Sequence, residues 1–75
     1  MTVPNALVVK IQKMAEAAIG YDVGVTLPLS DQGFDSYDLI CFEIDLECEF
    51  NLDNVEVSDT CTIEKIASYI DNLAS

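Results

Sequence analysis

The residues best suited to chemistry in this chain form the run Gly33-Phe34-Asp35-Ser36-Tyr37, which places a hydroxyl beside a carboxylate just before a stretch without turn residues. A serine that precedes a helix is most often an N-cap, and Asp35 can serve the same purpose. A helix start also suits a phosphodiester, because free backbone N–H groups and the helix dipole favour an anion there. The run therefore leaves two interpretations of Ser36 open, a helix cap or the attachment point of an anionic group.

Catalysis by Ser36 is not expected, because the chain lacks a base to activate it. There is no histidine, which is the commonest general base and a common metal ligand. Lys10, Lys13 and Lys65 lie in segments that carry no nucleophile–base motif. We therefore predict no catalytic residue and expect a protein that is not an enzyme.

The three cysteines, Cys41, Cys48 and Cys61, do not form a disulfide framework or a metal site. Cys41 and Cys48 are two helical turns apart, ~10 Å, which is too far for a disulfide. Zinc needs further cysteine or histidine ligands, and the acidic loops lack the glycine and glutamate positions of a calcium-binding EF-hand loop. We expect the cysteines to act as small apolar side chains in reducing surroundings, and we predict no metal site.

The element that must position Ser36 is a helix over the residues that follow, Asp38 to Phe50. Polar and apolar residues alternate from Glu43 to Phe50, which is typical of a strand, but glutamate and leucine favour helix and few residues are β-branched. On a helix the apolar residues fall on two opposed stripes. The inner stripe is Leu39, Phe42, Leu46 and Phe50, and the outer stripe is Tyr37, Cys41, Ile44 and Cys48.

The outer stripe has two possible explanations, since a helix on the outside of a domain needs only one apolar stripe. Either the helix is buried on both sides, or the outer stripe is an apolar strip for a partner, lined by acids on both flanks. We favour the partner strip, because so short a chain has little material to cover both faces.

The other elements are predicted from apolar spacing and from turn residues. A first helix over about residues 3–19 ends at Gly20, and the connection to Asp35 is expected to pack over the helices through its apolar residues. A polar connection spans Asn51 to Asp59. A last helix over about residues 62–73 has an apolar stripe of Ile63, Ile66, Ala67, Ile70 and Leu73.

Length and charge limit the class of protein. Seventy-five residues predict one domain over residues 1–75, and 14 acidic against 3 basic residues give a net charge of −11. Such a chain should avoid nucleic acid and anionic membranes and be attracted to basic protein surfaces. The start lacks the basic and apolar regions of a signal peptide, and no stretch predicts a membrane span, so a cytoplasmic location is expected.

The run Gly33-Phe34-Asp35-Ser36-Tyr37 resembles the Gly-x-Asp-Ser-Leu motif of acyl carrier proteins. The acidic stretch ending in Glu49-Phe50 and the closing run from Thr62 to Ile66 also fall where that family has counterparts, so the resemblance spans essentially the whole chain. It implies an all-α fold, a small four-helix bundle with a long first loop and a short third helix between Asn51 and Asp59. Tyr37 departs from the usual leucine, and Cys41 and Cys48 stand where many members have acids.

The same resemblance implies a non-enzymatic carrier that holds a fatty acyl or polyketide intermediate as a thioester on 4′-phosphopantetheine. The group would come from coenzyme A and be attached to Ser36, beside Asp35. Expected partners are a phosphopantetheinyl transferase and acyl-loading, synthase and acyltransferase enzymes with basic patches, which a monomer would meet through Tyr37, Asp38, Ile40, Ile44 and Glu47. The alternatives are an aminoacyl or peptidyl carrier, and an unmodified acidic interaction module such as an inhibitor or a DNA mimic.

Overall fold

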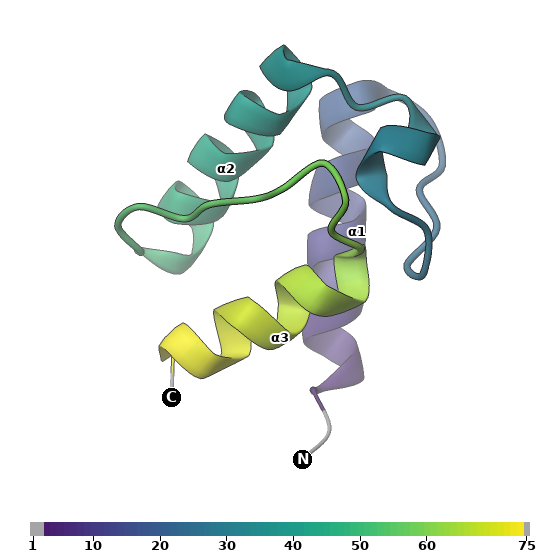
Figure 1. Ribbon diagram of the computed structural model, residues 1–75. Coiled ribbons are helices and arrows are strands. Elements are labelled where there is room, and N and C mark those ends of the chain that lie inside the picture. The colour runs from purple at the N-terminus through teal and green to yellow at the C-terminus, as the bar shows by residue number, and fades with distance from the viewer. Residues whose placement is uncertain (1–2, 75) are drawn as a thin grey trace.

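The computed structural model describes residues 3–74 and consists of helices joined by two long connections (Figure 1). Helix α1 spans Asn5–Ile19, α2 spans Ser36–Phe50 and α3 spans Ile63–Ala74, and a short 3₁₀ helix, Leu29–Gln32, lies within the first connection. No strand occurs among the described residues. The all-α class is therefore confirmed.

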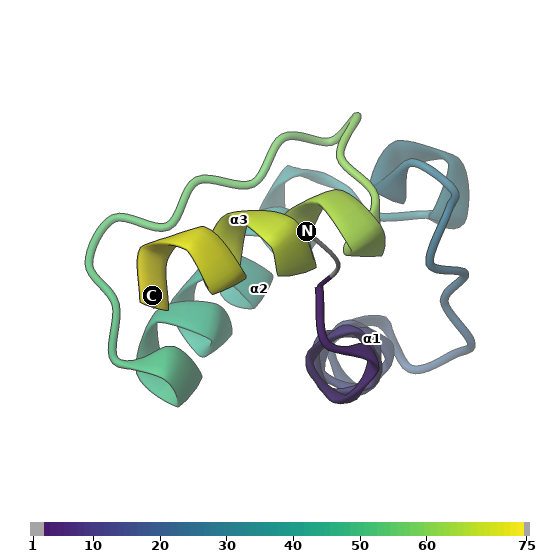
Figure 2. The same ribbon diagram turned by 90° about the horizontal axis from the view of Figure 1, so that it is seen from below.

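The predicted four-helix bundle is wrong, because the described residues contain three α-helices and no short third helix between Asn51 and Asp59. This region instead contains an extended segment, residues 54–58, which we call the strap. Figures 1 and 2 show it passing over the gap between α2 and α3, on the side away from α1. The three helices are therefore joined by two long connections rather than one, and α3 begins at Ile63.

Local sequence and side chains of α2 together explain why the strap is not helical. Asn54 has a positive φ of 55°, and the β-branched Val55 and Val57 alternate with the exposed Glu56. Both valines are buried, at 3% and 8% exposure. Their backbone N–H groups donate to carboxylates of α2, at 2.9 Å for Val55 and 2.7 Å for Val57, in place of the carbonyls of a helical turn.

Helix α1 lies against both α2 and α3, and the core fills the space among these three helices and the two connections (Figure 2). Gly20 ends α1 with a φ of 82°, as predicted from its place in the sequence. Every α-helix and both connections contribute to the core. Its buried apolar residues are Ile11, Ala15, Val23, Leu29, Phe34, Phe42, Leu46, Val55, Val57, Ile63, Ile66, Ala67 and Ile70.

The first connection packs over the helices only in part. Val23, Leu29 and Phe34 are buried, whereas Tyr21 and Leu27 are more than half exposed, contrary to the expectation that they also pack. The Gln32 side chain holds the loop closed, since its amide accepts from the Gly24 N–H and donates to the Gly24 and Leu27 carbonyls. This closed loop delivers Phe34 into the core two residues before the start of α2.

Helix α3 starts where the Thr62 hydroxyl accepts a hydrogen bond from the Lys65 N–H, at 3.2 Å. Four of the five residues in its predicted stripe are buried, and these are Ile63, Ile66, Ala67 and Ile70. The fifth, Leu73, is 47% exposed, so the buried stripe ends earlier than predicted, at Ile70.

Candidate functional site

The start of α2 is fixed by Asp35 rather than by Ser36. The Asp35 carboxylate accepts a hydrogen bond from the Asp38 N–H at 2.9 Å, and the Asp38 carboxylate accepts one from the Asp35 N–H at 3.2 Å. This pair of reciprocal bonds is a capping box, in which each carboxylate satisfies a backbone donor that the helix leaves free. Of the two interpretations of Ser36, the helix cap is therefore wrong.

Ser36 is the first residue of α2, and its side chain is exposed. Within the described part of the chain its hydroxyl makes no hydrogen bond, because Asp35 and Asp38 already provide the cap. Phe34 anchors the chain just before Ser36. Its side chain is 5% exposed, and the centroid of its ring lies 5.9 Å from that of the tilted Phe42 ring. The fold thus presents a free hydroxyl on a rigid helix start.

A groove of about 530 Å³ runs beside Ser36, and we call it the Ser36 groove. Helix α2 and the end of the first connection form one wall, and the strap with the residue after it forms the other. It is open to solvent and combines apolar with polar lining. The lining residues are Phe34, Asp35, Ser36, Leu39, Ile40, Glu43, Val57, Ser58 and Asp59.

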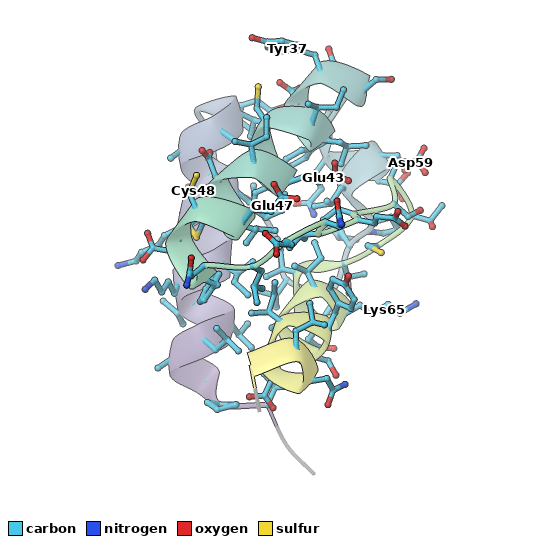
Figure 3. The ribbon with its side chains drawn as sticks, turned by 90° about the vertical axis from the view of Figure 1, so that its left-hand side faces the viewer. Tyr37, Glu43, Glu47, Cys48, Asp59 and Lys65 are labelled. Carbon is cyan, nitrogen blue, oxygen red and sulfur yellow. The ribbon has the colours of Figure 1, made fainter. Side chains whose placement is uncertain are left out.

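The surroundings of Ser36 are acidic. Asp35 and Asp59 are exposed at the Ser36 groove, Glu43 lines it, and Asp38 lies in the first turn of α2. No lysine lines this groove, and Lys65 projects from α3 away from the acids of α2 (Figure 3). The surface around Ser36 is therefore negatively charged, and such a surface attracts groups of positive charge.

The outer stripe of α2 faces solvent, so the explanation that buries the helix on both sides is wrong. Of its four residues, Tyr37 and Ile44 are 73% and 52% exposed, Cys48 is also exposed and Cys41 is partly buried. Ile40, which lies next to this stripe, is 53% exposed. Tyr37 extends from the same end of α2 as Ser36 (Figure 3). Its hydrogen bond with the Cys41 sulfur, together with the charge of an ionised Cys41, raises the pKa of Tyr37 above the ordinary value of a tyrosine.

The inner stripe of α2 is buried as predicted, with Phe42 and Leu46 fully inaccessible and Leu39 and Phe50 packed against the core. Ser36 and the outer stripe are therefore held in place by side chains on the opposite face of the same helix. Of the residues predicted to meet partners, Tyr37, Ile40 and Ile44 are exposed. The other two are only half-exposed, because Asp38 belongs to the capping box and Glu47 accepts a hydrogen bond from the Val55 N–H.

Two acids of α2 have a structural role that their place on the helix did not indicate. Glu43 accepts a hydrogen bond from the Val57 N–H and Glu47 accepts one from the Val55 N–H, and both side chains point from α2 toward the strap (Figure 3). Both side chains are accordingly only half-exposed. The Val55-Glu56-Val57 alternation was the sequence signal for an extended segment that could have indicated this contact.

The described residues offer neither a metal centre nor a disulfide. They contain no cluster of three or more histidine, cysteine, aspartate or glutamate side chains that could hold a metal ion. Cys41, Cys48 and Cys61 are free thiols, with Cys48 exposed and the other two partly buried. What the site offers chemically is an exposed hydroxyl, a mixed groove beside it and an acidic helix with an apolar outer stripe.

The chain was also examined for membrane-spanning helices and for similarity to known proteins. No helix within residues 3–74 has the length and apolar character needed to cross a membrane. Comparison with known protein families, with curated proteins and with solved structures gave no match.

Proposed function

We propose that the protein is a carrier that bears 4′-phosphopantetheine on Ser36 and presents an acyl group to partner enzymes. The observation that carries the proposal is the free, exposed hydroxyl of Ser36 on the first turn of α2, beside a capping box that takes over the structural role a serine usually has there. A serine kept at this place without a structural bond is available for modification. The resemblance of the run from Gly33 to Tyr37 to the acyl carrier protein motif implies that the modification is 4′-phosphopantetheine.

The residues around Ser36 fit such a group. The N–H groups of Ser36 and Tyr37, at the positive end of the α2 dipole, make no hydrogen bond within the described residues, and donors of this kind favour a phosphodiester. The Ser36 groove offers apolar surface from Leu39 and Ile40. When bound, phosphopantetheine would supply a thiol on a long arm, which holds an acyl group as a reactive thioester.

The acids near Ser36 support recognition by basic enzymes rather than tight capture of the arm. Asp35, Asp38 and Asp59 repel the phosphodiester, so the arm is not drawn onto the protein surface by charge. The same acids attract a phosphopantetheinyl transferase and the loading, synthase and acyltransferase enzymes that would follow. Tyr37, Ile40 and Ile44 supply the apolar part of that contact.

The proposal is tested by intact-protein mass spectrometry after incubation with coenzyme A and a phosphopantetheinyl transferase. We expect one phosphopantetheine mass to be added to the wild-type chain and none to Ser36→Ala. Ser58→Ala is the matched control, because Ser58 lines the same groove but lacks the Gly-x-Asp run, and it should be modified like the wild type.

A Ser36→Ala chain that still gained this mass would overturn the assignment of the site. A folded wild-type chain that gained no mass with several transferases would instead favour the unmodified acidic interaction module. The choice among fatty acyl, polyketide and aminoacyl cargo follows from a second measurement on the modified chain, the mass gained with each class of loading enzyme.

A further inference from the structure

Most of the strap is tied to the rest of the protein through side chains rather than through backbone–backbone hydrogen bonds. In residues 54–57 the backbone makes no hydrogen bond to another backbone group of the described chain, whereas the chain on either side does so through Leu52, Asp59 and Cys61. At Ser58, the last residue of the strap, the carbonyl accepts a hydrogen bond from the Cys61 N–H. The backbone bonds of residues 54–57 among the described residues run from the Val55 N–H to Glu47 and from the Val57 N–H to Glu43. The side chains of Val55 and Val57 are buried and add an apolar attachment.

The two bonds match in spacing as well as in chemistry. Glu43 and Glu47 are one helical turn apart, a rise of ~6 Å at 1.5 Å per residue. Val55 and Val57 are two residues apart on an extended chain, ~6.6 Å at 3.3 Å per residue. An extended segment antiparallel to α2 can therefore place both N–H groups opposite both carboxylates at once, and a carboxylate is a strong acceptor for a backbone N–H.

We propose that the strap is a conformational unit that lifts from α2 as a whole, with Glu43 and Glu47 as its two latches. Asn51 and Asn54, both at positive φ, form the turn at one end, and the hydrogen bond from the Ser30 N–H to the Asp59 carbonyl fixes the other end. The closed strap forms the second wall of the Ser36 groove through Val57 and Ser58. Lifting it converts the surroundings of Ser36 from a walled groove to an open helix face.

Lifting of the strap would change access to a group attached to Ser36, and this consequence rests on the proposed function. The motion itself does not depend on any modification. It is measured on the unmodified full chain by hydrogen exchange of single amides, followed by nuclear magnetic resonance, so that its outcome is independent of whether Ser36 accepts phosphopantetheine.

The decisive variants are Glu43→Ala and Glu47→Ala, each measured separately. Because the strap lifts as a unit, each single variant should speed exchange of both the Val55 and the Val57 amide, by about tenfold or more for a lost charge-assisted bond. The Leu29 amide, which donates to the Cys61 carbonyl outside the strap, is the reference and should be affected less than the strap amides. Asp45→Ala is the matched control, since Asp45 is an exposed acid of α2 without a hydrogen bond among the described residues.

Conservative variants keep the test decisive if an alanine variant unfolds. Glu43→Gln and Glu47→Gln retain an oxygen that accepts a hydrogen bond but no charge, so they should give a smaller acceleration at the same two amides. If each variant accelerated only the amide that its own residue binds, the two bonds would be independent and the unit would not exist. If the Leu29 amide accelerated as much as the strap amides, or if Asp45→Ala matched the latch variants, the proposal would be equally overturned.

Discussion

Asp35 and Ser36 are neighbours, and both have short polar side chains that can cap a helix. They nevertheless have different roles at the start of α2. Asp35 lies just before the helix, where its carboxylate reaches the Asp38 N–H. Ser36 lies one residue later, where its own backbone is already helical and its side chain is exposed to solvent. One residue of displacement therefore separates a group used for stability from a group available for chemistry.

Replacing Asp35 should destabilise the protein, whereas replacing Ser36 should not. Loss of an N-cap costs about 0.5–2 kcal/mol of unfolding free energy, so Asp35→Ala should melt several degrees below the wild type by circular dichroism. Asp35→Asn should recover most of the loss, because asparagine is an equally good cap. Equal destabilisation by Asp35→Ala and Ser36→Ala would contradict the assignment of the cap to Asp35.

Tyr37 should titrate at lower pH once Cys41 is removed. The interaction with the Cys41 sulfur is the main cause that raises the pKa of Tyr37, so Cys41→Ala should shift it back toward the ordinary value of a tyrosine, near 10. The measurement is ultraviolet absorbance of the tyrosinate against pH, with Tyr37→Phe in both backgrounds to identify the signal. An unchanged titration in Cys41→Ala would show that the two side chains do not interact in solution.

At the scale of the element, α2 combines a buried apolar face and an exposed apolar face in one helix. The inner stripe places Phe42 and Leu46 in the core, and the outer stripe leaves Ile44 and Tyr37 in solvent. The third side of the helix, with Glu43 and Glu47, holds the strap. Because three surfaces of α2 have separate tasks, substitutions on each should have separable effects.

Leu46→Ala and Ile44→Ala should give opposite results. Truncating a fully buried leucine costs ~2–5 kcal/mol, a large share of the stability of so small a domain, so Leu46→Ala should melt much earlier. Ile44 is 52% exposed, and its truncation should change stability by no more than ~0.5 kcal/mol while it weakens contact with partners. The pair is compared by thermal melting beside a transferase loading assay. Full loading of a stable Ile44→Ala chain would remove the outer stripe from the recognition surface for that enzyme.

For the whole molecule, the dominant feature is charge that the chain cannot neutralise. Of its three lysines, Lys10 pairs with Glu49 at 2.8 Å and lies over the Phe50 ring, which ties α1 to the end of α2. Lys65 and Lys13 form no salt bridge within the described residues. A net charge of −11 on 75 residues leaves strong mutual repulsion among the acids.

Added salt should therefore stabilise the protein. Screening acts over a Debye length of ~8 Å at physiological ionic strength, so the melting temperature should rise between low and physiological sodium chloride, by about 4–8 °C for each kcal/mol gained. A chain with Asp45→Asn and Asp53→Asn, two exposed acids, should show a smaller rise. A melting temperature that is independent of salt in both chains would mean that repulsion does not limit stability.

The sequence by itself determined the features that depend on local pattern. Apolar residues at helical spacing predicted the three α-helices to within a few residues, Gly20 marked the end of α1, and the two stripes of α2 were assigned to the correct faces. The residue types and spacing from Gly33 to Tyr37 left two interpretations of Ser36, and the family resemblance made it the candidate site. These features are predictable because a helix brings together residues three and four apart, and their types are visible along the chain.

Only the tertiary structure decided the features that depend on distant partners. The residues between Asn51 and Asp59 were predicted to form a short helix, but Val55 and Val57 found acceptors eight and fourteen residues earlier, on Glu47 and Glu43. Likewise, Tyr21, Leu27 and Leu73 are large apolar residues that are nevertheless exposed. Burial and hydrogen bonding at these positions are set by which elements the path of the chain brings alongside, and the order of residues does not specify that path locally.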